Sequence, residues 1–198
     1  MVKIVEGTLD RRAVVATLLR NRADTLVVTG LGSPSYDVHA AGDHDGNYYL
    51  WGAMGAAALV GLGLAQAQPT RTVLVVTGDG EQLMGLGGLA TIVVAAPPNL
   101  VVVVLDNGHY GETGMQRSHS GFGIDLAAMA QAAGFAEARS IIDQSGVEAL
   151  VQRLAMPASG PRFYVVKVTP ANLPRSLPAR DAVHGKNRLR SHLGLSVT

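Results

Sequence analysis

Continuous apolar runs indicate where the strands of this chain lie. Residues 25–29 (TLVVT), 72–77 (TVLVVT), 100–105 (LVVVVL) and 162–169 (RFYVVKVT) are rich in β-branched residues and do not alternate with polar ones. Runs of this kind are typical of strands that are buried on both faces, as in a parallel sheet. The pattern therefore predicts four or five such strands.

Segments with apolar residues at helical spacing lie between these runs. We predict helices over residues 8–20, 53–66, 82–96, 125–134 and 146–156, the first with Thr8 as its N-cap. We predict a loop over residues 106–123, and a loop or a short helix over residues 35–47. Strands that alternate with helices indicate a parallel sheet with helices on both faces, a three-layer α/β/α fold. We expect one domain over residues 1–170 and a tail, residues 171–198, that packs on the domain or on a partner.

Composition narrows the functional classes. The chain has 198 residues, no Cys and a net charge of +1, so disulfides, thiolate metal sites and a general attraction to nucleic acid are excluded. Charged residues make up only 16%, which is typical of a small chain that hides part of its surface against a partner. The apolar segment 53–67 is too short to span a bilayer, and the N-terminus lacks the apolar core of a signal peptide. We expect a cytoplasmic protein.

Two polar turns follow the two most apolar strands. Asp79 lies between Gly78 and Gly80, directly after one strand and before a helix, where a backbone can approach a bulky anion. A carboxylate there would repel a phosphate unless a cation lay between them, so Asp79 is a candidate ligand of Mg²⁺ or Ca²⁺ that bridges to a diphosphate. Asn107 ends the next strand and offers a neutral oxygen to the same cation, and the backbone carbonyl of His109 is the third candidate.

This arrangement resembles the diphosphate-metal motif of thiamine diphosphate (ThDP) enzymes, in which an Asp, an Asn and a backbone carbonyl hold Mg²⁺. The resemblance implies a cofactor site that includes Gly78, Asp79, Gly80, Glu81, Asn107, His109, Tyr110 and Gly111. A second stretch, Leu50-Trp51-Gly52-Ala53-Met54-Gly55, resembles the segment that cradles the aminopyrimidine ring. There Gly52, Ala53 and Met54 would contact the ring, with Met54 under the bent cofactor.

The finer likeness is to the β subunit of sulfopyruvate decarboxylase and to the C-terminal part of phosphonopyruvate decarboxylase, carried by residues 47–55 and 111–116. Members of the family also need a Glu at N1′ of the pyrimidine, which belongs to a separate pyrimidine-binding domain. Neither Glu81 nor Glu112 is placed for that role. The resemblance therefore implies an essential Glu on a partner (α) subunit, in a hetero-oligomer such as α2β2 or larger.

Each of these residues also has a simpler explanation. Asp-Gly and Asn-Gly are ordinary turn formers and Met54 alone suits a core, but their combination favours the metal site. His109, His119 and His44 are candidates for a catalytic His. His44, together with His39, Asp43 and Asp45, could also belong to a solvated loop or to a second metal site. The arginines of the tail could be exposed to solvent or could contact a partner or an anionic substrate. The Gly-x-Gly pairs at residues 30–32 and 61–63 lack the context of a dinucleotide-binding fingerprint.

The sequence thus favours the ThDP- and Mg²⁺-binding subunit of a 2-oxo acid decarboxylase that acts on a short substrate with an anionic tail. Two other hypotheses stay open. One is a subunit of another ThDP enzyme, an acetolactate-synthase-like carboligase or a 2-oxo acid oxidoreductase. The other is a non-catalytic subunit that binds ThDP for assembly or regulation.

Overall fold

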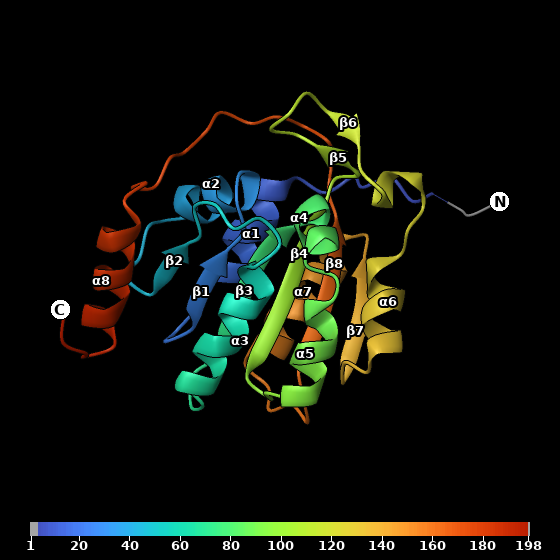
Figure 1. The fold of residues 1–198 in the computed structure, drawn as a ribbon. Coiled ribbons are helices and arrows are strands. Elements are labelled where there is room, and N and C mark those ends of the chain that lie inside the picture. Colours follow the sequence, from blue (N-terminus) through green and yellow to red (C-terminus); the bar gives the residue numbers. More distant parts are fainter. Residues whose placement is uncertain (1–3, 198) are drawn as a thin grey trace.

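Six parallel strands form the main sheet of the protein. In the computed structural model, which describes residues 4–197, their order is β2-β1-β3-β4-β8-β7 (Figure 1). The strands are β1 (Leu26–Thr29), β2 (Asn47–Tyr49), β3 (Val73–Gly78), β4 (Leu100–Asp106), β7 (Glu137–Ile141) and β8 (Arg162–Lys167). The central strands β3 and β4 are almost wholly buried, as their continuous apolar runs predict.

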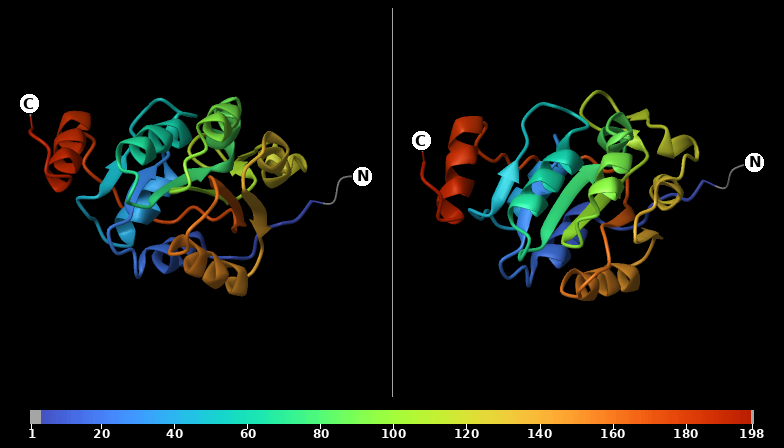
Figure 2. Two further views of the ribbon diagram at one scale, coloured as in Figure 1. Left: turned by 90° about the horizontal axis from the view of Figure 1, so that it is seen from below. Right: turned by 60° about the horizontal axis from the view of Figure 1, so that its bottom comes forward.

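Helices cover both faces of this sheet (Figure 2). One face packs on α3 (Ala57–Ala67), α5 (Gly88–Ala95) and α6 (Leu126–Ala133), and the other on α1 (Arg11–Leu19), α2 (Ser33–Ala40) and α7 (Gln144–Leu154). Strand β3 shows how one strand serves both layers, because Val73 and Val75 enter the first core and Leu74 and Val76 the second. The predicted three-layer α/β/α fold is confirmed.

Two predicted helices begin later than expected. Helix α1 is capped by Asp10, whose Oδ1 accepts a hydrogen bond from Ala13 N at 2.7 Å. Thr8 is not the cap, because Leu9 still forms a parallel bridge to Val168, the residue after β8. Helix α3 begins at Ala57 and not at residue 53. The residues before it form a turn in which Gly52, Ala53 and Gly55 have positive φ, which a right-handed helix does not allow.

The predicted helix over residues 82–96 is two helices. The first, α4 (Asp79–Met84), starts at the end of β3, and the second is α5. The break falls where two backbones touch: a Cβ added to Gly85 would lie 2.0 Å from the carbonyl oxygen of Gly55. This close contact fixes the turn around Gly55 against the end of α4.

Short elements account for the other differences. The predicted loop over residues 106–123 holds a two-stranded hairpin, β5 (His109–Tyr110) with β6 (Gln116–Arg117), and the 3₁₀ turn η1 (Ser120–Phe122). Strands β2 and β7 had not been predicted, because the first is very short and the second carries exposed polar residues at the edge of the sheet.

The C-terminal segment crosses the sheet. Residues 170–181, which we call the strap, run over the carboxyl ends of the strands and lead to α8 (Ala182–His192) beside β2 (Figure 1). Helix α8 was not predicted. Residues 1–3 and 198, which belong to the predicted segments 1–170 and 171–198, lie outside the described residues. Within residues 4–197, every helix is too short or too polar to cross a membrane.

Candidate functional site

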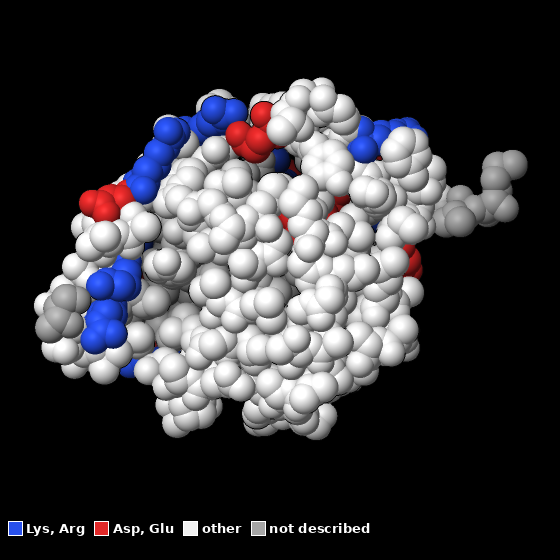
Figure 3. Space-filling view, viewed as in Figure 1, with Lys and Arg blue, Asp and Glu red and all other residues white. Residues whose placement is uncertain are grey.

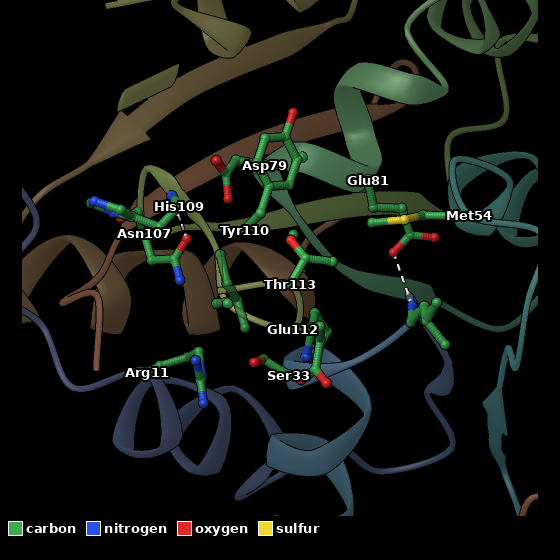
Figure 4. Close-up of a pocket in the computed structure, with 16 residues that line it drawn as sticks. Arg11, Ser33, Met54, Asp79, Glu81, Asn107, His109, Tyr110, Glu112 and Thr113 are labelled. Atoms are coloured by element: carbon green, nitrogen blue, oxygen red, sulfur yellow. Dashed lines mark hydrogen bonds between the residues drawn. The ribbon is translucent and has the colours of Figure 1, made fainter. Parts of the chain in front are cut away.

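A pocket open to solvent lies at the carboxyl ends of β3 and β4 (Figure 4). These two strands are neighbours in register, with Gly78 opposite Leu105, so the turns that follow them open at the same edge of the sheet. The residues that line it come from α1, the start of α2, the turn before α3, the β3–α4 junction and the loop after β4; they are Arg11, Leu31, Ser33, Pro34, Met54, Gly78, Asp79, Gly80, Glu81, Leu105, Asn107, His109, Tyr110, Gly111, Glu112 and Thr113.

Asp79 is the most enclosed acid of this pocket, with 2% of its surface exposed. It opens α4, where unpaired backbone N–H groups favour a negative charge. Its Oδ2 accepts hydrogen bonds from the hydroxyls of Ser118 and Ser120, the second at 2.7 Å. Burial, followed by the nearby charge of Asp106, still raises the pKa of Asp79 above its usual value.

Asp106 lies behind Asp79 and is equally buried. Lys167, opposite it in the register of β4 and β8, pairs with Asp106 Oδ2 at 2.5 Å. Asp106 Oδ1 lies 2.8 Å from Ser120 Oγ and accepts a hydrogen bond from Gly108 N at 3.0 Å. Among the described residues, the Lys167 ammonium pairs with Asp106 and Asp79 forms no ion pair, which leaves negative charge that a further cation would offset.

Asn107 and His109 form a tight turn at the same edge. Asn107 Oδ1 accepts a hydrogen bond from His109 N at 2.9 Å, and the His109 ring nitrogen Nδ1 lies 2.8 Å from the Asn107 carbonyl oxygen. Both residues line the pocket with Asp79 (Figure 4). The structure thus brings together the three residues that the sequence proposed as metal ligands.

The turn before α3 contributes Met54. Its side chain is 43% exposed and lies at the pocket beside Glu81 (Figure 4). Gly52 and Ala53, predicted to contact the same ring, belong to this turn but are not among the lining residues. No described atom lies within 4 Å of a Cβ added to Gly52 or to Gly78, so these two backbone positions leave open space.

Glu81 lines the pocket but is bonded to the protein. Its Oε2 accepts hydrogen bonds from Leu31 N at 3.0 Å and Thr77 Oγ1 at 2.9 Å, and its Oε1 accepts one from Gly55 N at 3.4 Å. Burial raises the pKa of Glu81 in spite of these donors. Its carboxylate therefore holds two turns together beneath the pocket, a role that the sequence prediction of a cofactor contact did not include.

The ring of Tyr110 closes another side. A Cβ added to Gly80 would lie 2.3 Å from Tyr110 Cε1, so the ring lies directly over that backbone. Tyr110 OH is 3.3 Å from His119 Nδ1. Gly80, Tyr110 and Gly111 all line the pocket, as predicted.

The other two candidate histidines are not pocket-lining residues. His119 reaches the pocket only through Tyr110. His44 lies near the β2 edge, where its ring centre is 5.2 Å from that of His192 on α8. Of the three candidates for a catalytic His, only His109 is placed at the pocket.

Sequence reasoning missed the groups behind the metal-ligand candidates. Ser118 and Ser120 carry no pattern that sets them apart from other loop serines. Lys167 had a weak signal, because it lies near the end of one predicted strand and Asp106 directly follows another, and pairing those strands would have placed the two side by side.

Comparison with known proteins adds the family. A family model described as "Thiamine pyrophosphate enzyme, C-terminal TPP binding domain" matches residues 36–168. Thiamine pyrophosphate is another name for ThDP. The matched segment contains Met54, Asp79, Asn107 and His109.

Two relatives cover most of the chain. It is 40% identical over 164 residues to "Sulfopyruvate decarboxylase subunit beta" of Methanothermobacter thermautotrophicus, an alignment that covers 83% of this chain and 84% of the relative. It is 41% identical to "Phosphonopyruvate decarboxylase" of Streptomyces viridochromogenes, over 80% of this chain but only 41% of that longer protein.

Solved structures share the fold at lower identity. A putative thiamin diphosphate-dependent enzyme from Mycobacterium smegmatis matches 82% of this chain and 32% of its own with a TM-score of 0.69 at 24% identity. Benzoylformate decarboxylase from Polynucleobacter necessarius matches 84% of this chain and 34% of its own, also with a TM-score of 0.69, at 22% identity.

Proposed function

The chain belongs to the family of the C-terminal TPP binding domain of thiamine pyrophosphate enzymes, and we propose that it is the ThDP- and Mg²⁺-binding subunit of a 2-oxo acid decarboxylase. The observation that carries this proposal is the 40% identity to a decarboxylase β subunit over 84% of that subunit's length. The pocket at the ends of β3 and β4 is the proposed cofactor site.

The donor set suits Mg²⁺. Asp79, Asn107 and the carbonyl of His109 would supply three hard oxygen ligands from two adjacent turns. Of the two buried acids Asp79 and Asp106, Asp106 pairs with Lys167 in the described part of the chain, so a divalent cation would relieve the remaining negative charge. In this role Asp79 and Asn107 would hold the cation, whose charge would offset that of the diphosphate.

The backbone of the pocket suits a bulky cofactor. The open space over Gly78 allows close approach at the diphosphate end, and the start of α4 offers backbone N–H groups there. Met54 would support the bent cofactor with its apolar side chain. Bound ThDP would supply the electron sink that takes up the electron pair left when a 2-oxo acid loses CO₂, and these residues would grip and shape the cofactor.

A partner subunit would complete the site. The carboxylates that line the pocket are already engaged: Asp79 by two serines, Glu81 by Leu31, Thr77 and Gly55, and Glu112 by Arg175 at 2.9 Å. An additional Glu for the pyrimidine ring would therefore come from another polypeptide, and three relatives carry the name "subunit beta".

The surface of α3 and α5 is the proposed place for this partner. Between residues 50 and 105 the charged residues are Arg71, Asp79 and Glu81, and the two acids are buried. The face over these helices is accordingly free of charge in Figure 3, whereas Lys, Arg, Asp and Glu gather at its rim. Leu59, Met84 and Val94 are exposed there. An uncharged face with exposed apolar side chains is typical of a subunit interface.

The substrate class follows from the relatives. Their names point to sulfopyruvate and phosphonopyruvate, short 2-oxo acids with an anionic tail. Carboligation or oxidation on the same cofactor, and non-catalytic binding of ThDP, are the alternatives that an activity assay separates.

Calorimetry with ThDP and Mg²⁺ tests the cofactor site. We expect the wild-type chain to bind both together and Asp79→Asn to lose at least tenfold in Mg²⁺ affinity, while Asp24→Asn on the exposed surface binds as the wild type does. Equal binding by Asp79→Asn would remove the metal assignment. CO₂ release from sulfopyruvate, phosphonopyruvate and pyruvate, measured together with the aldehyde product in the presence of the co-expressed partner, tests the reaction. CO₂ release with a ligation or oxidation product in place of the aldehyde would overturn it.

A further inference from the structure

A polar network lies directly behind Asp79. The hydroxyls of Ser118 and Ser120 both donate to Asp79 Oδ2, and their Oγ atoms are 2.9 Å apart. Both serines are buried, Ser118 completely and Ser120 to 3% exposure. Buried hydroxyls that converge on one carboxylate oxygen fix the rotation of that carboxylate.

The network chooses between the two oxygens of Asp79. Because both serines bond to Oδ2, the other oxygen, Oδ1, has no serine donor in the described part of the chain. The side chain is thereby held in one orientation, with one oxygen occupied by the protein and one left for another ligand.

Ser120 also reaches Asp106, at 2.8 Å. A hydroxyl carries one hydrogen and cannot donate to two carboxylates at once. Asp106 has other donors, since Lys167 Nζ lies 2.5 Å from its Oδ2 and Gly108 N lies 3.0 Å from its Oδ1. Lys167 and Gly108 therefore satisfy Asp106 and release the hydrogen of Ser120 for Asp79.

We propose that Ser118 and Ser120 are positioning residues that hold Asp79 with Oδ1 ready for the cation, and that the Asp106–Lys167 pair keeps Ser120 in place. This inference rests on the proposed function, because it concerns the same cation site. The serines act through Asp79 and do not contact the cation themselves. Groups that hydrogen-bond to a metal ligand typically change metal affinity 10- to 100-fold when removed.

The test measures Mn²⁺ as a stand-in for Mg²⁺, by electron paramagnetic resonance on the full chain with its co-expressed partner and saturating ThDP. We expect the dissociation constant of Mn²⁺ to rise about tenfold in Ser120→Ala and further in the Ser118→Ala/Ser120→Ala double variant. Ser159→Ala, on the exposed surface, should bind as the wild type does. The thermal unfolding midpoint without cation is recorded for every variant, since a purely structural role would lower it and leave Mn²⁺ affinity unchanged.

If the serines acted on Asp79 only through electrostatics, their removal would change the Mn²⁺ affinity in the opposite direction. Loss of two donors leaves Asp79 more basic, so unchanged or tighter Mn²⁺ binding by the double variant would overturn the inference. A second variant checks the ion pair: Asp106→Asn/Lys167→Met removes both charges together and should also weaken Mn²⁺ binding, because Ser120 is less firmly held. If the wild type binds no Mn²⁺ with ThDP, the proposed function fails and the inference fails with it. If the wild type binds Mn²⁺ and the serine variants bind it equally well, the inference alone is overturned.

Discussion

Gly78 and Gly80 lie on either side of Asp79, yet their surroundings differ. A Cβ on Gly80 would lie 2.3 Å from the ring of Tyr110, whereas one on Gly78 would meet no described atom within 4 Å. Gly78 has an extended backbone that any residue can adopt. Gly80 is therefore required by packing within the protein, whereas Gly78 leaves open space that a ligand would fill.

These surroundings predict opposite effects of two alanines. Gly80→Ala should lower the free energy of unfolding by about 1–3 kcal/mol, because Tyr110 must move. Gly78→Ala should leave stability unchanged but weaken ThDP binding. Urea unfolding and calorimetry on the two variants check both halves. Since Ala favours a helix over Gly by about 1 kcal/mol, a stabilised Gly80→Ala protein would show that the ring contact is unimportant.

Glu81 leads to a second prediction at this scale. Glu81→Ala would leave the backbone N–H groups of Leu31 and Gly55 without their acceptor. We expect a loss of about 1–3 kcal/mol for each buried donor that stays unpaired, measured by urea unfolding. Glu148→Ala, on the exposed side of α7, is the matched control. Equal stability of the two variants would mean that water replaces the carboxylate.

The sequence predicted the pocket residues better than their contacts. Asp79 and Asn107 stand out because each ends an apolar strand, and adjacent parallel strands place such residues together. Ser118 and Ser120 belong to a loop whose path depends on the β5–β6 hairpin, and no local pattern reports it. The part played by each residue in holding a cation stays a prediction.

Among the elements, α8 is attached at the edge of the sheet by polar contacts and by the packing of Leu189, with Leu193 at its C-cap, against the core. Arg188 pairs with Asp43 at 2.6 Å, donates to the Asn47 carbonyl at 3.1 Å and lies over the ring of Tyr49. The apolar pattern of α8 is weak, so sequence periodicity did not predict it. The break between α4 and α5 was missed for a similar reason, because the contact of Gly85 with Gly55 joins residues far apart in the chain.

The attachment of α8 should weaken in acid. Burial, then the charges of Arg22 and His192, lower the pKa of His44 below its usual 6.5, against the opposite effect of Asp43 and Asp45. The folded state therefore binds this proton less tightly than the unfolded state, and stability falls as pH drops through 6.5. Hydrogen exchange corrected for intrinsic rates should show faster exchange of residues 182–192 at pH 5.5 than at pH 8. His44→Gln should reduce the difference; an unchanged pH dependence in that variant would assign it to other groups.

At the scale of the molecule, fold and cofactor are where the sequence was most informative. Alternating strands and helices predict the three-layer fold, and the resemblance of the motif to that of ThDP enzymes implies ThDP; both are confirmed by the sheet topology and the family match. Low charge predicted a partner but not its location. The location that we propose rests on the fold, in which α3 and α5 lie in contact and expose one uncharged face (Figure 3).

This face supports a prediction about assembly. Val94 on α5 is 88% exposed, so Val94→Glu should leave the isolated chain folded. If the partner covers the face, the new carboxylate is buried without a counter-ion, at an effective penalty of several kcal/mol. With about 1.4 kcal/mol for each factor of ten, association should weaken roughly 100-fold or more in sedimentation velocity with the co-expressed partner. Val183→Glu on α8, where Val183 is 63% exposed, is the matched control and should associate as the wild type does. A Val94→Glu chain that still forms the full complex would place the partner on another surface.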